Sequence, residues 1–148
     1  MRDVATVELG SAPRLGIVGH DDADDIVDAL VLLASMLGHE ARGYPGAQGI
    51  LRDLAAFDPD VVFCDLHMPK VTRFMFAELM RAEPSLAHVY LIAHSALTGG
   101  GVTALALKSG FDDFCAKPAM PEDIEAGIRK GATVSEQRAG QGFAVVRH

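Results

Sequence analysis

Residues 61–65 read Val-Val-Phe-Cys-Asp, an apolar run that ends in a carboxylate. A short run that is apolar at every position is typical of a strand buried on both faces of a parallel sheet. This run and three other strand-like runs, in which apolar residues predominate, each end beside a residue that can do chemistry: 15–20 before Asp21-Asp22, 61–64 before Asp65, 89–94 before Ser95, and 111–116 before Lys117-Pro118. Every candidate reactive side chain therefore follows a predicted strand.

Helix-like segments alternate with these runs, which is the pattern of β-α units around a parallel sheet. The predicted strands are 15–20, 40–44, 61–64, 89–94 and 111–116, and the predicted helices are 23–37, 47–57, 74–83, 102–109 and 121–130. The glycine-rich stretch 97–101 is expected to be a loop. The sequence thus predicts one α/β domain over residues 14–131, with flexible ends at 1–13 and 132–148.

Composition excludes several classes of function. The chain has 148 residues and a formal net charge of −7, with no basic cluster, so nucleic-acid binding is not expected. No apolar stretch approaches the roughly 20 residues of a membrane span, and no signal peptide is recognised. The two cysteines, Cys64 and Cys115, fall in strands that an intervening strand would separate, so we expect no disulfide and a cytoplasmic location.

The carboxyl ends of parallel strands meet at one edge of the sheet, where ligands bind. Carboxylates at Asp21, Asp22 and Asp65 suit Mg²⁺, which prefers oxygen ligands. An aspartate can also accept a phosphoryl group, for which Lys117 would supply counter-charge and Ser95 a hydroxyl. Simpler roles stay open, because an aspartate can cap a helix, a serine can sit in a turn and a lysine can be solvated.

The arrangement resembles the receiver domain of two-component response regulators, over roughly residues 14–131 and in the single-domain form of the chemotaxis regulators. The resemblance is carried by Asp21-Asp22, by Asp65-Leu66-His67-Met68-Pro69, by Ser95 and by Lys117-Pro118. It implies a flavodoxin-like, doubly wound parallel sheet of five strands in the order 2-1-3-4-5, with five helices.

The resemblance also implies roles for these residues. Asp65 would accept a phosphoryl group from a sensor histidine kinase or a histidine phosphotransfer protein. Mg²⁺ would be held by Asp22, Asp65 and the backbone carbonyl of His67, and Asp21 would act through a metal-bound water. After phosphorylation, Ser95 and Phe114 would change position and so alter the surface that contacts a downstream protein or a second copy of the chain. Such a domain is not an enzyme, but it takes part in its own phosphotransfer and autodephosphorylation.

Three features depart from a plain receiver pattern. Arg73 stands where the loop after the phosphoacceptor usually carries glycine, so either this loop is remodelled or the arginine overhangs the pocket. His20, His67 and His94 lie near one end of the predicted sheet, but strand alternation directs His20 and His94 away from the pocket and argues against a zinc or copper site. The predicted helix 23–37 is apolar beyond one stripe, which indicates exposed apolar surface.

Two other functions fit part of the pattern. A degenerate receiver would serve as an interaction module without being phosphorylated. In that case Arg73 and the glycine-rich stretch would be signs that phosphorylation has been lost. A haloacid-dehalogenase-type phosphohydrolase would also use an aspartyl nucleophile and Mg²⁺, but it needs a second aspartate two positions later, where this chain has His67.

Overall fold

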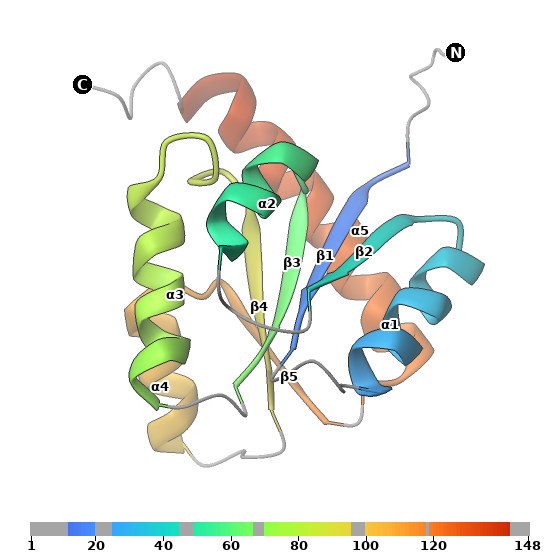
Figure 1. Ribbon diagram of the computed structural model, residues 1–148, viewed down its shortest axis with the longest axis horizontal. Coiled ribbons are helices and arrows are strands. Elements are labelled where there is room, and N and C mark those ends of the chain that lie inside the picture. The colour runs from blue at the N-terminus through green and yellow to red at the C-terminus, as the bar shows by residue number, and fades with distance from the viewer. Residues whose placement is uncertain are drawn as a thin grey trace.

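A parallel five-stranded sheet with helices on both faces organises the chain (Figure 1). The computed structural model describes residues 12–19, 25–44, 49–66, 70–95, 100–117 and 119–142. The strands are β1 (Arg14–Val18), β2 (Glu40–Tyr44), β3 (Val61–Asp65), β4 (Tyr90–Ser95) and β5 (Asp113–Ala116). Their order is β2-β1-β3-β4-β5, which confirms the predicted flavodoxin-like topology.

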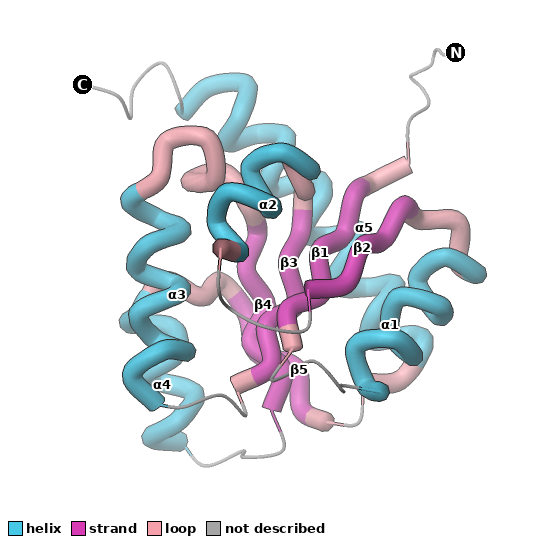
Figure 2. Tube along the Cα trace, in the orientation of Figure 1, coloured by secondary structure: helices cyan, strands magenta, loops and turns pink. Residues whose placement is uncertain are grey.

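The described ranges contain five α-helices, distributed over the two faces of the sheet (Figure 2). They are α1 (Asp25–Met36), α2 (Ile50–Phe57), α3 (Lys70–Ala82), α4 (Gly100–Ser109) and α5 (Pro121–Gln137). One apolar cluster joins α1 and α5 to the sheet through residues such as Ile17, Phe63 and Ile128. The other joins α2, α3 and α4 to the opposite face. Alternate residues of the apolar strands supply the two clusters, as expected for a sheet buried on both sides.

Two helices begin earlier than the sequence indicates. The helix α3 begins at Lys70 rather than near residue 74, so Arg73 lies within a helix and needs no positive φ. The helix α4 includes Gly100 and Gly101, which we expected in a loop. Helix propensity is a weak prior that tertiary packing overrides, and Val102 and Ala106 of α4 pack against the core.

The last helix is longer than predicted. It begins at Pro121, with Asp123 Oδ2 accepting a hydrogen bond from the Met120 N–H at 3.0 Å, but it continues past Lys130 to Gln137. A π-helical turn, η1 (Arg138–Gly142), follows, so residues 132–142 are helical where a flexible tail was expected. The ends 1–11 and 143–148 lie outside the described residues.

An ion-pair network fixes the C-terminal end of α5 against the sheet. Arg138 Nη2 lies 2.8 Å from Asp112 Oδ1, and Arg81 of α3 lies 2.6 Å from Asp112 Oδ2. The two arginines also donate to backbone carbonyls, including that of Val89. Burial raises the pKa of Asp112, but hydrogen bonds from Arg138 and the Leu91 N–H, with the charge of Arg81, outweigh burial and lower that pKa. Asp112 therefore joins α3, β4 and η1, the turn that continues α5.

The apolar surplus of the first helix is exposed, as the sequence predicted. Leu32 is 62% exposed and Met36 is 74% exposed. Both cysteines are free, which confirms the expected absence of a disulfide. Among the described helices, none combines the length and the apolar character that a membrane span requires.

Candidate functional site

Asp65 closes β3 at the carboxyl edge of the sheet. The four residues before it are buried and apolar, so the strand is held between the two helical layers. Asp65 pairs in register with His94 of β4 and is 7% exposed, and the next residue, Leu66, donates its N–H to the His94 carbonyl at 3.0 Å. A carboxylate is thus held at the end of a central strand, where little solvent reaches it.

Lys117 follows β5 and places its ammonium group on this carboxylate. Lys117 Nζ donates a hydrogen bond to Asp65 Oδ1 at 2.8 Å, and both side chains are largely buried. The backbone contributes to this placement, because the Lys117 N–H donates to the Ser95 carbonyl at 2.9 Å. Removing both charges from water is costly, and their pairing offsets part of that cost.

Ser95 is the last residue of β4 and is 2% exposed. It pairs in register with Ala116, the residue before Lys117. Three strand ends therefore bring Asp65, Ser95 and Lys117 to one edge of the sheet, as the sequence predicted for their positions. This arrangement is suited to holding an anionic group between a carboxylate and an ammonium, beside a hydroxyl.

The other predicted site residues lie outside the described residues. These are Asp21 and Asp22, His20 and His67, and Pro118. The chain that leads to the acidic pair leaves the sheet at the same edge, because Val18 pairs with Cys64, the neighbour of Asp65. The Gly19 N–H still donates to the Tyr44 carbonyl at 2.8 Å. The backbone of Arg73 is described, but its side chain is not.

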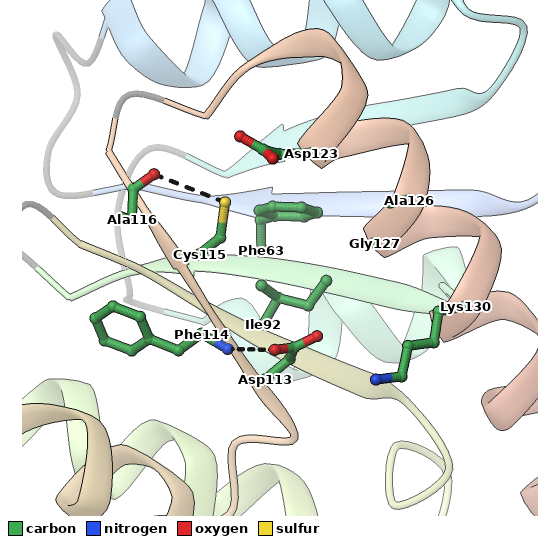
Figure 3. Close-up of a pocket in the computed structure, with 10 residues that line it drawn as sticks. All are labelled: Phe63, Ile92, Asp113, Phe114, Cys115, Ala116, Asp123, Ala126, Gly127 and Lys130. Carbon is green, nitrogen blue, oxygen red and sulfur yellow. Dashed lines mark hydrogen bonds between the residues drawn. The ribbon is translucent and has the colours of Figure 1, made fainter. Parts of the chain in front are cut away.

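Phe114, the predicted switch aromatic, lies on the edge strand β5. It pairs in register with Ala93 and packs against the cluster formed with α2, α3 and α4. Figure 3 shows its ring directed away from Cys115, which points toward Phe63 and α5. A cavity of about 340 Å³ separates β5 from α5 at this place. Phe114 is only partly buried.

His94 does not face the carboxylate pocket. It is 3% exposed and meets the ring of Phe63 edge-on, with centroids 6.2 Å apart and an interplanar angle of 79°. This contact lies on the α1 and α5 side of the sheet, in agreement with the alternation of β4. Among the described residues, no group of three or more His, Cys, Asp or Glu side chains could hold a metal ion.

Sequence reasoning missed the cluster of Arg81, Asp112 and Arg138. It lies at the amino ends of β4 and β5, far from the phosphoacceptor edge, and it is structural. The three residues are separated by up to 57 positions, and no motif links them. The one signal in the sequence is the acidic pair Asp112-Asp113 at the start of β5.

Comparison with known proteins agrees with this geometry. The family model for the response regulator receiver domain matches residues 17–129. Solved structures with the same fold include a response regulator from Thermotoga maritima, with a TM-score of 0.72 and 16% identity over 83% of this chain and 99% of that one. A CheY-like receiver domain protein from Methanospirillum hungatei gives a TM-score of 0.73 with 20% identity, covering 86% and 99% of the two chains.

Among curated proteins, the transcriptional regulatory protein CreB of Escherichia coli is 27% identical over 110 residues, or 74% of this chain. "Probable transcriptional regulator ycf27" of Galdieria sulphuraria is 30% identical over 109 residues, again 74% of this chain. The chain spans less than half the length of these relatives, 47% and 42% respectively. The fold, the carboxylate–lysine edge and the family match together show that this chain belongs to the response regulator receiver domains of two-component signalling.

Proposed function

We propose that this receiver domain is a phosphorylation switch in which Asp65 accepts a phosphoryl group from a phosphohistidine on a partner protein. The observation that carries this proposal is the hydrogen bond of 2.8 Å from Lys117 Nζ to Asp65 Oδ1 at the buried edge of the sheet. Phosphoryl transfer depends mainly on positioning and on offsetting charge, and this pair supplies a nucleophile and a cation already in contact.

In the proposed step, an oxygen of the Asp65 carboxylate attacks the phosphorus atom. The phosphorus–nitrogen bond to the donor imidazole breaks, and the imidazole leaves with the electron pair. The ammonium of Lys117 then faces an oxygen of the acyl phosphate rather than a bare carboxylate. The hydroxyl of Ser95, at the end of β4, would donate a hydrogen bond to another phosphate oxygen.

The residues at this edge also fit a magnesium ion, because the donor set consists of oxygens. Asp65 supplies a carboxylate, and β1 delivers the chain toward Asp21 and Asp22 at the same edge. We propose Asp22, Asp65 and the His67 carbonyl as direct ligands, with Asp21 acting through water. Bound Mg²⁺ would offset the charge of the transferring phosphoryl group.

Phosphorylation would be read through Ser95 and Phe114. When Ser95 binds the new phosphate, the partly buried ring of Phe114 can move inward, and the surface of α4, β5 and α5 changes with it. Phenylalanine has no hydroxyl, so the inward state gains packing without a hydrogen bond. Hydrolysis of the acyl phosphate would return the domain to its resting state, so the chain acts as a switch rather than an enzyme.

The partners follow from this role. A sensor histidine kinase or a histidine phosphotransfer protein would donate the phosphoryl group, and Leu32 and Met36 of α1 offer an exposed apolar surface for its helices. A downstream protein, or a second copy of the chain, would receive the signal in the cytoplasm. The net charge of −7 favours protein targets over nucleic acid, and we propose residues 14–131 as the receiver module.

The test is transfer of radiolabelled phosphate from a phosphorylated histidine donor. We expect label on the wild-type chain in the presence of Mg²⁺, none after chelation with EDTA, and none on Asp65→Asn. A chain that keeps its fold and receives no label from several competent donors would instead be the degenerate interaction module.

A further inference from the structure

A second hollow lies at the opposite end of the sheet from Asp65. It has a volume of about 410 Å³ and is enclosed between the residues that precede β1, β3 and β4 and the last turns of α5. In Figure 1 this is the upper end of the view, where β1 begins and α5 ends. None of the residues placed at the phosphoacceptor edge lines it, so the function proposed above does not use it.

Carboxylates surround this hollow. Asp58, Asp60 and Glu136 line it, and the Asp58 side chain is 62% exposed at its mouth. Asp60 is partly buried, and burial raises its pKa even though the Arg14 N–H donates to its Oδ2 at 2.9 Å. His88 Nε2 lies 3.7 Å from Asp58 Oδ1. The hollow therefore presents more negative charge than the neighbouring groups offset.

Ser135 adds an observation that does not depend on charge. It is fully buried, and its Oγ has no hydrogen-bond partner among the described residues. It lies on the face of α5 that lines the hollow, together with Ala132 and Glu136, and Ala139 of the following turn η1 lines the hollow as well. A buried hydroxyl without a hydrogen-bond partner lowers the stability of the fold, and a ligand in the hollow that hydrogen-bonds to it would remove that penalty.

Two other occupants fit the hollow less well. The guanidinium of Arg14 is directed elsewhere, toward Glu40 Oε1 at 3.4 Å and the Phe57 carbonyl at 3.3 Å. A metal ion needs ligands closer together than these, because no group of three or more His, Cys, Asp or Glu in the described part of the chain could hold one. The carboxylates lie apart, with small apolar side chains between them. This lining is complementary to a cation that is longer than a metal ion and partly apolar.

We propose that this hollow is a binding site for a small alkylammonium ligand, which the Asp58, Asp60 and Glu136 carboxylates attract and to which the Ser135 hydroxyl hydrogen-bonds. The ammonium group donates to carboxylate and hydroxyl oxygens, and the alkyl chain lies against Ala132 and Ala139. Because the hollow lies between the residues that precede β1, β3 and β4 and the last turns of α5, its ligand would hold those turns against the sheet.

The probe is 1,4-diaminobutane, titrated into the full chain labelled with ¹⁵N and followed by backbone amide shifts. The neutral control is 1-butanol, and NaCl at matched ionic strength controls for screening. The variants are Ser135→Ala, which removes the hydroxyl with little change in shape, and Asp60→Asn, which removes one charge. Asp53→Asn, an exposed aspartate on α2, is the matched control. Thermal unfolding checks that each variant folds.

We expect saturable shifts at Asp60, His88 and Ser135 with the diamine and none with butanol. The affinity should fall about tenfold in Ser135→Ala and in Asp60→Asn, as for one lost hydrogen bond to a charged group, and stay unchanged in Asp53→Asn. If the amide shifts do not saturate at diamine concentrations up to about 10 mM, the affinity is too weak for a binding site and the proposal is overturned. Wild-type affinity in Ser135→Ala would also overturn it, as would binding that centres on Asp65 and disappears in Asp65→Asn.

Discussion

The ammonium of Lys117 lies 2.8 Å from one carboxylate oxygen of Asp65, although 51 residues separate the two in the chain. The contact joins the ends of β3 and β5 across β4, and it is buried enough for solvent to screen it little. If phosphorylation uses this pair, Lys117 acts on the developing charge of the phosphoryl group as well as on the resting carboxylate.

Replacing Lys117 with methionine tests this role. Lys117→Met should lower the rate of phosphoryl transfer to Asp65 about 100-fold, the usual effect of removing one group that stabilises developing charge. The rate is measured from the growth of the phosphorylated species with time. Lys108→Met, an exposed lysine on α4, is the matched control and should react as the wild type does. Equal rates in the two variants would remove Lys117 from the mechanism.

The ion-pair network at Asp112 should contribute measurably to stability. Asp112→Asn keeps the shape of the side chain but leaves Arg81 and Arg138 without their carboxylate, so the free energy of unfolding in urea should fall by about 2 kcal/mol. Asp53→Asn, exposed on α2, should change it by less than about 0.5 kcal/mol.

The same network predicts how stability depends on pH. The pKa of Asp112 is lowered in the folded chain, so its contribution is present above the unfolded pKa of about 4 and is lost as pH falls through the folded pKa. Wild type and Asp112→Asn should therefore differ in stability near neutral pH and converge in acid. A difference that stays constant down to acid pH would contradict the ion-pair account.

Gly131 should tolerate no side chain. A Cβ at this position would lie 2.7 Å from Val61 Cγ2 and 2.8 Å from Tyr90 Cδ2, so α5 would have to move away from the sheet. We expect Gly131→Ala to destabilise the fold by about 1–3 kcal/mol, as overpacking does. Gly101→Ala in α4 meets nothing within 4 Å and should be neutral or stabilising. Thermal unfolding of the two variants compares them directly.

Tyr90 should titrate far above an ordinary tyrosine. Burial, the charge of Asp113 and its hydrogen bond at 3.2 Å raise the pKa of Tyr90 to about 12. Absorbance at the phenolate band should show Tyr90 ionising near pH 12, and Asp113→Asn should lower that value. Because the folded pKa is raised, this contribution to stability is complete below pH 10 and is lost as pH rises toward 12.

Much of the fold can be predicted from the sequence because its strands are short, apolar and separated by clear helix signals. The run 61–65 and the residues after three other strands already indicate one edge bearing Asp65, Ser95 and Lys117. The helix ends were harder to predict. Gly100 and Gly101 resemble a loop in composition, yet they belong to α4. The predicted last helix ended at residue 130, whereas α5 continues through Gly131, which packs closely against the sheet.

The remaining features depend on distant parts of the chain. Arg81 lies in α3, Asp112 directly precedes β5 and Arg138 lies in η1, and only the folded topology brings their side chains together. The hollow at Ser135 has the same origin, since its walls are formed by strand beginnings and the far end of α5. Local patterns cannot predict such sites, because nothing in the spacing of these residues links one to another.

The most direct test of the account is the intact mass of the chain after incubation with acetyl phosphate and Mg²⁺, with Asp65→Asn treated in parallel. The account predicts one phosphoryl adduct on the wild type and none on the variant. An unmodified wild-type chain, or an adduct of equal yield on Asp65→Asn, would contradict it.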